Sequence, residues 1–276
     1  MTWNPTYSSR QTARDVRAFV KEQQPAFWRI LKPLLPGIIG GELLNVLCAI
    51  IWPDHSNYMI LGSLITAYFL TCLAISWHRV TIHGPHAEPV NPLRPQRHEL
   101  AFIAMGIVLV LGYTLLNVAG IAISAAAMQL SQLWFARSLG LLAIALCIVG
   151  GIYLMLRVTI YFPAKAINNS LTIPQAFRLS KGLVLKLIIA PILASWRVLL
   201  AFLGYFIVSA AILVGFLALT EGMDTALQDR LGMLLAAILV LPQLVYFQPV
   251  INVLTISCLS NYYLLALERD NDTQGA

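Results

Sequence analysis

The side chains with the richest chemistry lie in one polar segment, residues 78–99, between two apolar runs. This segment contains the residue types that bind Zn²⁺ in proteins: His78, His83, His86, His98, Glu88 and Glu99. Their spacing matches no zinc signature, and the prolines between them favour an extended loop. We therefore expect a solvated loop that holds no metal ion, whose arginines, Arg79, Arg94 and Arg97, meet the phosphates of anionic lipids.

A second group of polar residues lies inside the apolar runs. Glu42 stands in the sequence GGELLN with Asn45 three residues further along the same helical face. A carboxyl group in hydrocarbon is costly and suggests a function, while the glycines beside it allow a second helix to approach closely. Two interpretations stay open: a structural bond inside the bundle, or transport and proton relay. For the structural bond, the candidate partners are Asn117, Arg157, Lys186 and Arg197.

The last apolar run is also unusually polar. Gln243, Gln248 and Asn252 lie in it, close to Pro242 and Pro249. These amides either line a cavity or satisfy the backbone groups that the prolines free.

No catalytic motif is present. The sequence contains no nucleophile elbow, P-loop, HExxH or GxGxxG pattern. The cysteines all lie in apolar runs, where they are expected to pack as small apolar side chains: Cys48, Cys72, Cys147 and Cys258. We expect no catalytic residue and no cofactor, and a non-enzyme is favoured.

Composition shows which elements must position these groups. Only 11% of the 276 residues are charged, against about 25% in soluble domains, and the mean hydropathy is +0.77. We therefore expect an all-α, polytopic bundle of about six transmembrane spans. The approximate spans are 34–52, 57–77, 100–124, 139–156, 198–219 and 233–267, with a turn at 53–56. Residues 1–33 and 268–276 are expected to be cytoplasmic tails on either side of a bundle at 34–267.

Two runs are too long for one simple crossing. At 1.5 Å per residue, residues 183–219 would reach about 55 Å, against a hydrocarbon core of about 30 Å. We expect an interfacial or broken part before Trp196 and Arg197. For residues 233–267, one long kinked helix is preferred to a re-entrant hairpin.

Two short helices are expected at the membrane surface. Residues 8–24 place Ala13, Val16, Phe19 and Val20 on one helical face and the basic residues elsewhere, as in an amphipathic interfacial helix. In residues 172–182, Thr172 and Gln175 have the spacing of a capping box. Basic residues accompany this second helix and are expected at the lipid phosphates: Lys165, Arg178 and Lys181.

One short sequence occurs twice. Residues 79–85 read RVTIHGP and residues 157–163 read RVTIYFP, so five of seven positions agree, and each copy follows a pair of apolar runs. Under a six-span topology both pairs have the same orientation, which predicts a parallel two-helix internal repeat. Arg79 and Arg157 are expected to extend to lipid phosphates at one face of the membrane.

The basic residues also predict the orientation. With a cytoplasmic N-terminus and six spans, fifteen Lys and Arg residues lie inside and two, Arg137 and Arg230, lie outside. The positive-inside rule therefore places both termini in the cytoplasm. Membrane lipids are the expected partners, with a protein partner or a second copy as a further candidate. Nucleic acid is not expected, since the chain has no soluble basic domain.

The two repeat copies and the short helix after the second resemble a bacterial family. The matching positions are Trp77, His78, Arg79, Arg157, Pro163, Ala164, Ala176, Ser180 and Gly182. The chain is similar to YciC-like inner-membrane proteins and to the membrane domain of some glycerophosphodiester phosphodiesterases. This resemblance implies a helical bundle in a bacterial inner membrane and assigns no catalytic residue.

Two functions are expected on these grounds. The first is a non-catalytic inner-membrane protein that binds anionic lipid, a protein partner or both, in envelope maintenance or complex assembly. The alternative is a transporter or lipid-handling carrier with a polar site around Glu42.

Overall fold

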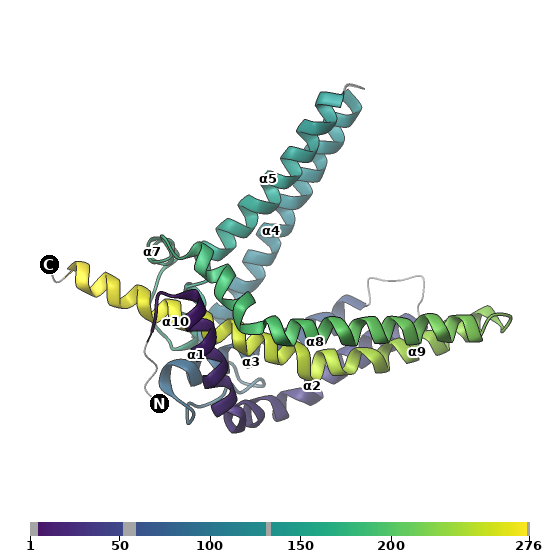
Figure 1. Cartoon of the computed structure of the whole chain (residues 1–276), viewed down its shortest axis with the longest axis horizontal. Coiled ribbons are helices and arrows are strands. Elements are labelled where there is room, and N and C mark those ends of the chain that lie inside the picture. The colour runs from purple at the N-terminus through teal and green to yellow at the C-terminus, as the bar shows by residue number, and fades with distance from the viewer. Residues whose placement is uncertain (1–4, 52–58, 131–133, 275–276) are drawn as a thin grey trace. The chain divides into compact units, whose positions relative to one another are not determined.

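The computed structural model describes residues 5–51, 59–130 and 134–274, and the turn expected at 53–56 lies outside them. Helices dominate these residues, and no strand occurs among them (Figure 1). Within the described residues, six helical segments are long and apolar enough to cross a membrane. The predicted all-α fold is confirmed, and the chain is a multi-pass membrane protein.

The spanning segments are joined by short connections and surface helices. They are α2 (Gln24–Ile51), α3 (Met59–His83), α4 (Arg97–Leu130), α5 (Trp134–Val158), α8 (Val184–Leu219) and the run formed by α9 (Thr225–Pro242), the π-helical turn η2 (Gln243–Phe247) and α10 (Gln248–Gln274). The shorter helices are α1 (Ser9–Glu22), α6 (Tyr161–Ala166) and α7 (Ile173–Leu179).

The chain divides into two compact units. The first contains residues 1–95 and 189–261, with the hairpin α2–α3, helix α1 and most of α8, α9 and α10. The second contains residues 96–188 and 262–276, with the hairpin α4–α5, helices α6 and α7 and the end of α10. Each unit is described by itself below.

Glycines set the packing of α2 on α3 in the first unit. A Cβ atom on Gly62 would collide with the carbonyl oxygen of Gly41, and a Cβ on Gly37 would collide with the ring of Phe69. Beside this crossing, the Thr66 hydroxyl donates to the Ile38 carbonyl at 3.3 Å. The close approach expected beside Glu42 is therefore present between α2 and α3, in the small-xxx-small pattern of membrane helices.

Of the two alternatives for the part before Trp196 and Arg197, the broken helix is wrong, because α8 is continuous from Val184 to Leu219. The interfacial alternative stays a prediction. Pro191 removes only one backbone donor, and the apolar residues on both sides continue the helix. The side chain of Ser195 donates to the Pro191 carbonyl at 2.7 Å.

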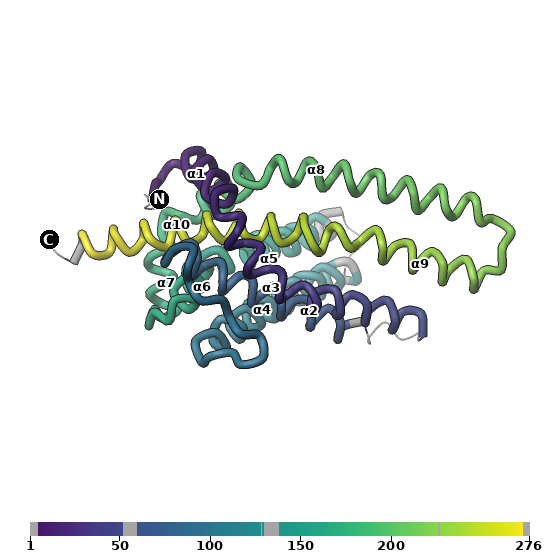
Figure 2. The backbone as a smooth tube through the Cα atoms, turned by 90° about the horizontal axis from the view of Figure 1, so that it is seen from below, coloured from purple at the N-terminus to yellow at the C-terminus, as the bar shows by residue number. Residues whose placement is uncertain are grey.

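The sixth segment is helical from residue 225 to residue 274, so the prediction of one long helix is confirmed and the re-entrant hairpin is not. The prolines produce a π-helical turn between α9 and α10. Gln243 N–H bonds to Val240 rather than to Leu239, and the freed Leu239 carbonyl accepts from the Tyr205 hydroxyl of α8. Figures 1 and 2 show α8 and α9 running side by side from their connection at residues 220–224.

The two copies of the repeat differ in local structure. Each follows a helical hairpin, as predicted, but the first five residues of the first copy lie inside α3, which continues to His83. The loop expected from residue 78 therefore begins only at Gly84, whose φ of 96° suits a residue without a side chain. The second copy bends after Val158 and continues as α6.

Candidate functional site

Helix α1 forms one wall of the candidate site. The Ser8 side chain caps its N-terminus by accepting from Gln11 N–H, at 3.4 Å. The predicted apolar face is confirmed, with Ala13, Val16 and Phe19 buried. This face packs on protein, since the Phe19 ring lies 6.2 Å from the ring of Trp77.

Trp77 holds α1 and α2 against α10. It is fully buried, and the ring of Phe27 packs on it edge-on at 6.1 Å. Its indole N–H donates to the Ser257 hydroxyl at 2.9 Å, and the neighbouring His78 Nδ1 lies 2.8 Å from the Ser260 hydroxyl. Trp77 and His78, which carry part of the family resemblance, are thus core residues of the first unit.

Two more contacts fix the position of α1. The Asn261 side chain of α10 donates to the Thr6 carbonyl at 3.1 Å and accepts from the Thr6 N–H at 3.2 Å. Further along the chain, the Arg17 guanidinium donates to the Leu193 carbonyl of α8 at 2.5 Å. Helix α1 therefore bridges α3, α8 and α10 inside the first unit.

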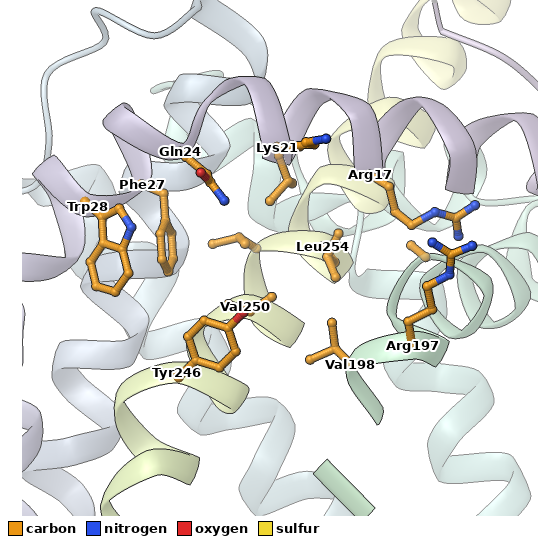
Figure 3. A pocket seen from close by; sticks show the side chains of 13 residues that line it. Arg17, Lys21, Gln24, Phe27, Trp28, Arg197, Val198, Tyr246, Val250 and Leu254 are labelled. Carbon is orange, nitrogen blue, oxygen red and sulfur yellow. The ribbon is translucent and has the colours of Figure 1, made fainter. Parts of the chain in front are cut away.

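A cavity of about 260 Å³, the α1 pocket, lies between α1, the start of α2, α8 and α10 (Figure 3). Three basic side chains line it, namely Arg17, Lys21 and Arg197, and no acidic residue does. The rest of the wall is mainly aliphatic and aromatic, with Phe27, Trp28, Val198, Tyr246, Val250 and Leu254 among its residues. In Figure 3 the side chains of Arg17 and Arg197 extend to the same end of the pocket, and the aromatic rings lie at the other.

Helix length is compatible with a position of this pocket at one surface of a membrane. At 1.5 Å per residue, α8 rises about 33 Å between Arg197 and Leu219, and the run from Thr225 to Tyr246 rises about 32 Å. Both lengths match a hydrocarbon core of about 30 Å. If the connection at 220–224 lies at one face of a membrane, Arg197 and Tyr246 would lie at the headgroup level of the opposite face. Trp28 and Tyr246 are aromatic types enriched at this depth.

Comparison with known protein families, curated proteins and solved structures finds no match for this chain.

The intramembrane polar residues predicted from the sequence do not line the α1 pocket. Asn45 Nδ2 donates to Glu42 Oε2 and to the Ser63 hydroxyl, both at 3.3 Å, at the α2–α3 crossing. Among the described residues, Asn45 is the hydrogen-bond partner of the Glu42 carboxyl group. The Asn45 Oδ1 atom is buried and accepts no hydrogen bond there.

The remaining predicted amides are distributed over several elements. Gln243 and Gln248 lie at the π-helical turn, and Asn252 lies in the following turn of α10. The freed backbone carbonyl at this turn is satisfied by Tyr205, not by these amides. Asn117 belongs to the second unit and donates back to the Tyr113 carbonyl of its own helix at 2.7 Å.

The basic residues of the first polar segment are mostly exposed. Arg94 and Arg97 are exposed, and Arg79 donates weakly to the Glu88 carbonyl at 3.4 Å. Glu99 is buried, and its carboxylate accepts from the Gln96 N–H at 2.6 Å. Over the described ranges no three His, Cys, Asp or Glu side chains form a group that could hold a metal ion.

Arg157 is bound inside the second unit. Its guanidinium donates to the Ser180 hydroxyl at 2.9 Å, the Phe177 carbonyl at 2.5 Å and the Tyr153 hydroxyl at 2.8 Å. It also lies over the Phe177 ring. Arg157 thus joins the end of α5 to the end of α7, a role that the sequence did not indicate.

Two other basic side chains around α7, those of Lys165 and Arg178, also have protein partners. Lys165 donates to the Asn169 carbonyl at 3.1 Å, and Arg178 pairs with Asp270 at 3.1 Å on an exposed surface. Arg269 of α10 donates to the backbone carbonyl of Lys181 at 3.1 Å, and the Lys181 side chain itself is exposed. The predicted capping box of α7 is confirmed, with Thr172 N–H donating to the Gln175 side chain at 2.8 Å.

Arg157→Lys is expected to loosen α7, because an ammonium group cannot reproduce the planar fork that bonds three partners. Because charge-assisted hydrogen bonds are lost, the local stability of α7 should fall by about 1.5–3 kcal/mol. Hydrogen–deuterium exchange should show faster exchange in residues 173–181. Arg178→Lys, at an exposed ion pair, is the matched control and should leave this exchange unchanged. Equal exchange rates in both variants would contradict the role given to Arg157.

The basic residues of the α1 pocket were not selected as site residues by the sequence analysis. Arg17 and Lys21 are four residues apart and therefore share one side of α1. This spacing is the sequence feature that could have indicated a joint site. Arg197 follows Trp196 inside a long apolar run, a pairing typical of a membrane surface. Only the tertiary structure shows that Arg17, Lys21 and Arg197 line the same cavity.

Proposed function

We propose that this chain is a non-catalytic protein of a bacterial inner membrane that binds anionic phospholipid in the α1 pocket. The observation that carries the proposal is a pocket lined by three cations and a mainly apolar wall, with no acidic residue among its lining residues. In this proposal, the lengths of α8 and of the run through α9 and η2 put the pocket at the headgroup level of the membrane. Arg17, Lys21 and Arg197 form no ion pair within the described residues. A lipid phosphate supplies the missing negative charge, and the apolar wall suits the first part of its tail.

The distribution of basic residues supports a cytoplasmic position for this pocket. Most Lys and Arg residues lie at the ends of the spans that would share its membrane face, as the positive-inside rule requires of the cytoplasmic side. Both termini are then cytoplasmic. A membrane protein that binds anionic lipid in this way suits envelope maintenance or complex assembly. The proposal also includes binding of a protein partner or of a second copy of this chain.

Native mass spectrometry of the full chain in a neutral detergent tests the proposal. The protein should retain phosphatidylglycerol in preference to phosphatidylcholine of the same acyl chains. The double variant Arg17→Gln, Arg197→Gln should lower the affinity for phosphatidylglycerol at least tenfold, which corresponds to about 1.4 kcal/mol. Arg10→Gln, Arg14→Gln removes the same charge from exposed positions of α1 and is the matched control. Equal affinity in the two double variants would contradict the proposed site.

The same experiment also reports on the alternative, a transporter or lipid-handling carrier with a site around Glu42. The buried, unpaired Asn45 Oδ1 atom favours this alternative. A small ligand that is retained by the unchanged protein and lost with Glu42→Gln would support it. Phosphatidylglycerol retention that does not change with Glu42→Gln supports the α1 pocket instead.

A further inference from the structure

The α1 pocket presents more positive charge than an ordinary phospholipid headgroup neutralises. Its three cations, Arg17, Lys21 and Arg197, carry about three positive charges, and none of the lining residues is acidic. A phosphodiester carries one negative charge, whereas a phosphomonoester carries about 1.5 to 2 at pH 7. We propose that the pocket selects lipids that end in a phosphomonoester, such as phosphatidic or lysophosphatidic acid. This inference rests on the proposed function.

The donor geometry of the pocket supports this choice. The Arg17 guanidinium is anchored to the Leu193 carbonyl through Nη1, which orients its other donors. Arg197 extends to the same end of the pocket, so two planar forks meet there (Figure 3). Guanidinium groups bind phosphate through paired hydrogen bonds, and Lys21 adds a point charge. A phosphomonoester offers three terminal oxygens to these groups, whereas a phosphodiester offers two.

The volume of the pocket limits the size of the group attached to the phosphate. A space of about 260 Å³ takes a phosphate with glycerol and the first methylenes, and the rest of a lipid lies outside it. A small headgroup therefore fits better than one with a second substituent beyond the phosphate.

The apolar wall distinguishes a lipid from free phosphate. Val198, Val250 and Leu254 line the pocket beside its basic end. Continuing along α8, Leu200 and Leu203 are more than half exposed and face the surroundings of the protein. An acyl chain that leaves the pocket along these residues stays in hydrocarbon, a contribution that inorganic phosphate lacks.

Competition binding to the full chain in neutral detergent tests the inference. The probes are lysophosphatidic acid, lysophosphatidylglycerol with the same acyl chain, and inorganic phosphate. The monoester should bind at least tenfold more tightly than the diester at pH 8, and this preference should shrink towards pH 5. The reason is that the second ionisation of the monoester has a pKa of about 6, so the ligand has lost its extra charge at pH 5.

Two single variants test whether the preference for the monoester depends on the basic end of the pocket. In Arg197→Gln the monoester preference should fall below about threefold, while Arg10→Gln should retain it. Equal binding of the two lysolipids would overturn the inference and leave the proposed function intact. Binding of neither lipid would overturn both. Inorganic phosphate that competes as well as lysophosphatidic acid would overturn the assignment of a lipid ligand.

Discussion

Trp77→Ala is expected to destabilise the protein by about 3–5 kcal/mol, the range for removing a large aromatic side chain from a packed core. Trp77 is fully buried and contacts three elements of the first unit at once. Phe19 of α1 and Phe27 of α2 pack on its ring, and its N–H reaches Ser257 of α10. Alanine therefore leaves a cavity beneath α1 and removes the contact that holds this helix in place.

A thermal-shift measurement in detergent checks this prediction. For a chain of this size, 3–5 kcal/mol corresponds to a fall in Tm of about 6–20 °C. Trypsin should also cleave α1 faster in the variant, since this helix carries exposed basic residues, among them Arg10, Arg14 and Lys21. The matched control is Trp196→Ala, because Trp196 is 44% exposed. A Trp77→Ala protein that melts within 2 °C of the unchanged protein would contradict the role of Trp77.

Ser257→Ala measures how much the indole hydrogen bond of Trp77 contributes to stability, apart from the packing of its ring. It removes the acceptor of the indole N–H and keeps both aromatic contacts, so it should cost about 1–3 kcal/mol. The same lipid-binding measurement then connects stability with function. Because Arg17 and Lys21 reach the α1 pocket only while α1 is docked, Trp77→Ala should weaken lipid binding although Trp77 itself does not line the pocket.

The sequence predicted those features of the fold that depend on local pattern. The spanning helices follow from the length of the apolar runs, and the capping box follows from the spacing of Thr172 and Gln175. The apolar face of α1 follows from a period of 3.6 residues. In each case the signal lies within a few turns of one helix, so no tertiary information is needed.

Features that depend on tertiary packing could not be predicted in this way. Arg157 has the sequence context of a surface anchor, yet its partners, Ser180 and Phe177, come from a helix twenty residues away. The α1 pocket combines α1 with residues of α8 and α10 that follow it by about 180–240 positions. The division into two units also could not be predicted from the sequence, since two of its three boundaries fall inside α8 and α10.

The α2–α3 crossing predicts that substitution of two glycines, Gly62 of α3 and Gly40 of α2, changes the stability of the protein in opposite directions. A Cβ on Gly62 would collide with the carbonyl oxygen of Gly41 and lie 2.7 Å from Asn45 Cγ. The Gly41 backbone can move only if the two helices separate, so Gly62→Ala should cost about 2 kcal/mol in spite of the better helix propensity of alanine. The separation would also break the bond between Asn45 and Ser63, which spans the same crossing.

Gly40→Ala is the control for this prediction. Gly40 is exposed, and a Cβ there would meet no atom within 4 Å. Alanine should therefore stabilise α2 by up to about 1 kcal/mol through helix propensity alone. In detergent, Tm should fall by about 4–8 °C for Gly62→Ala and rise by up to about 4 °C for Gly40→Ala. A Tm that rises equally in both variants would mean that α2 and α3 do not pack at Gly62, because only a close helix crossing reverses the sign.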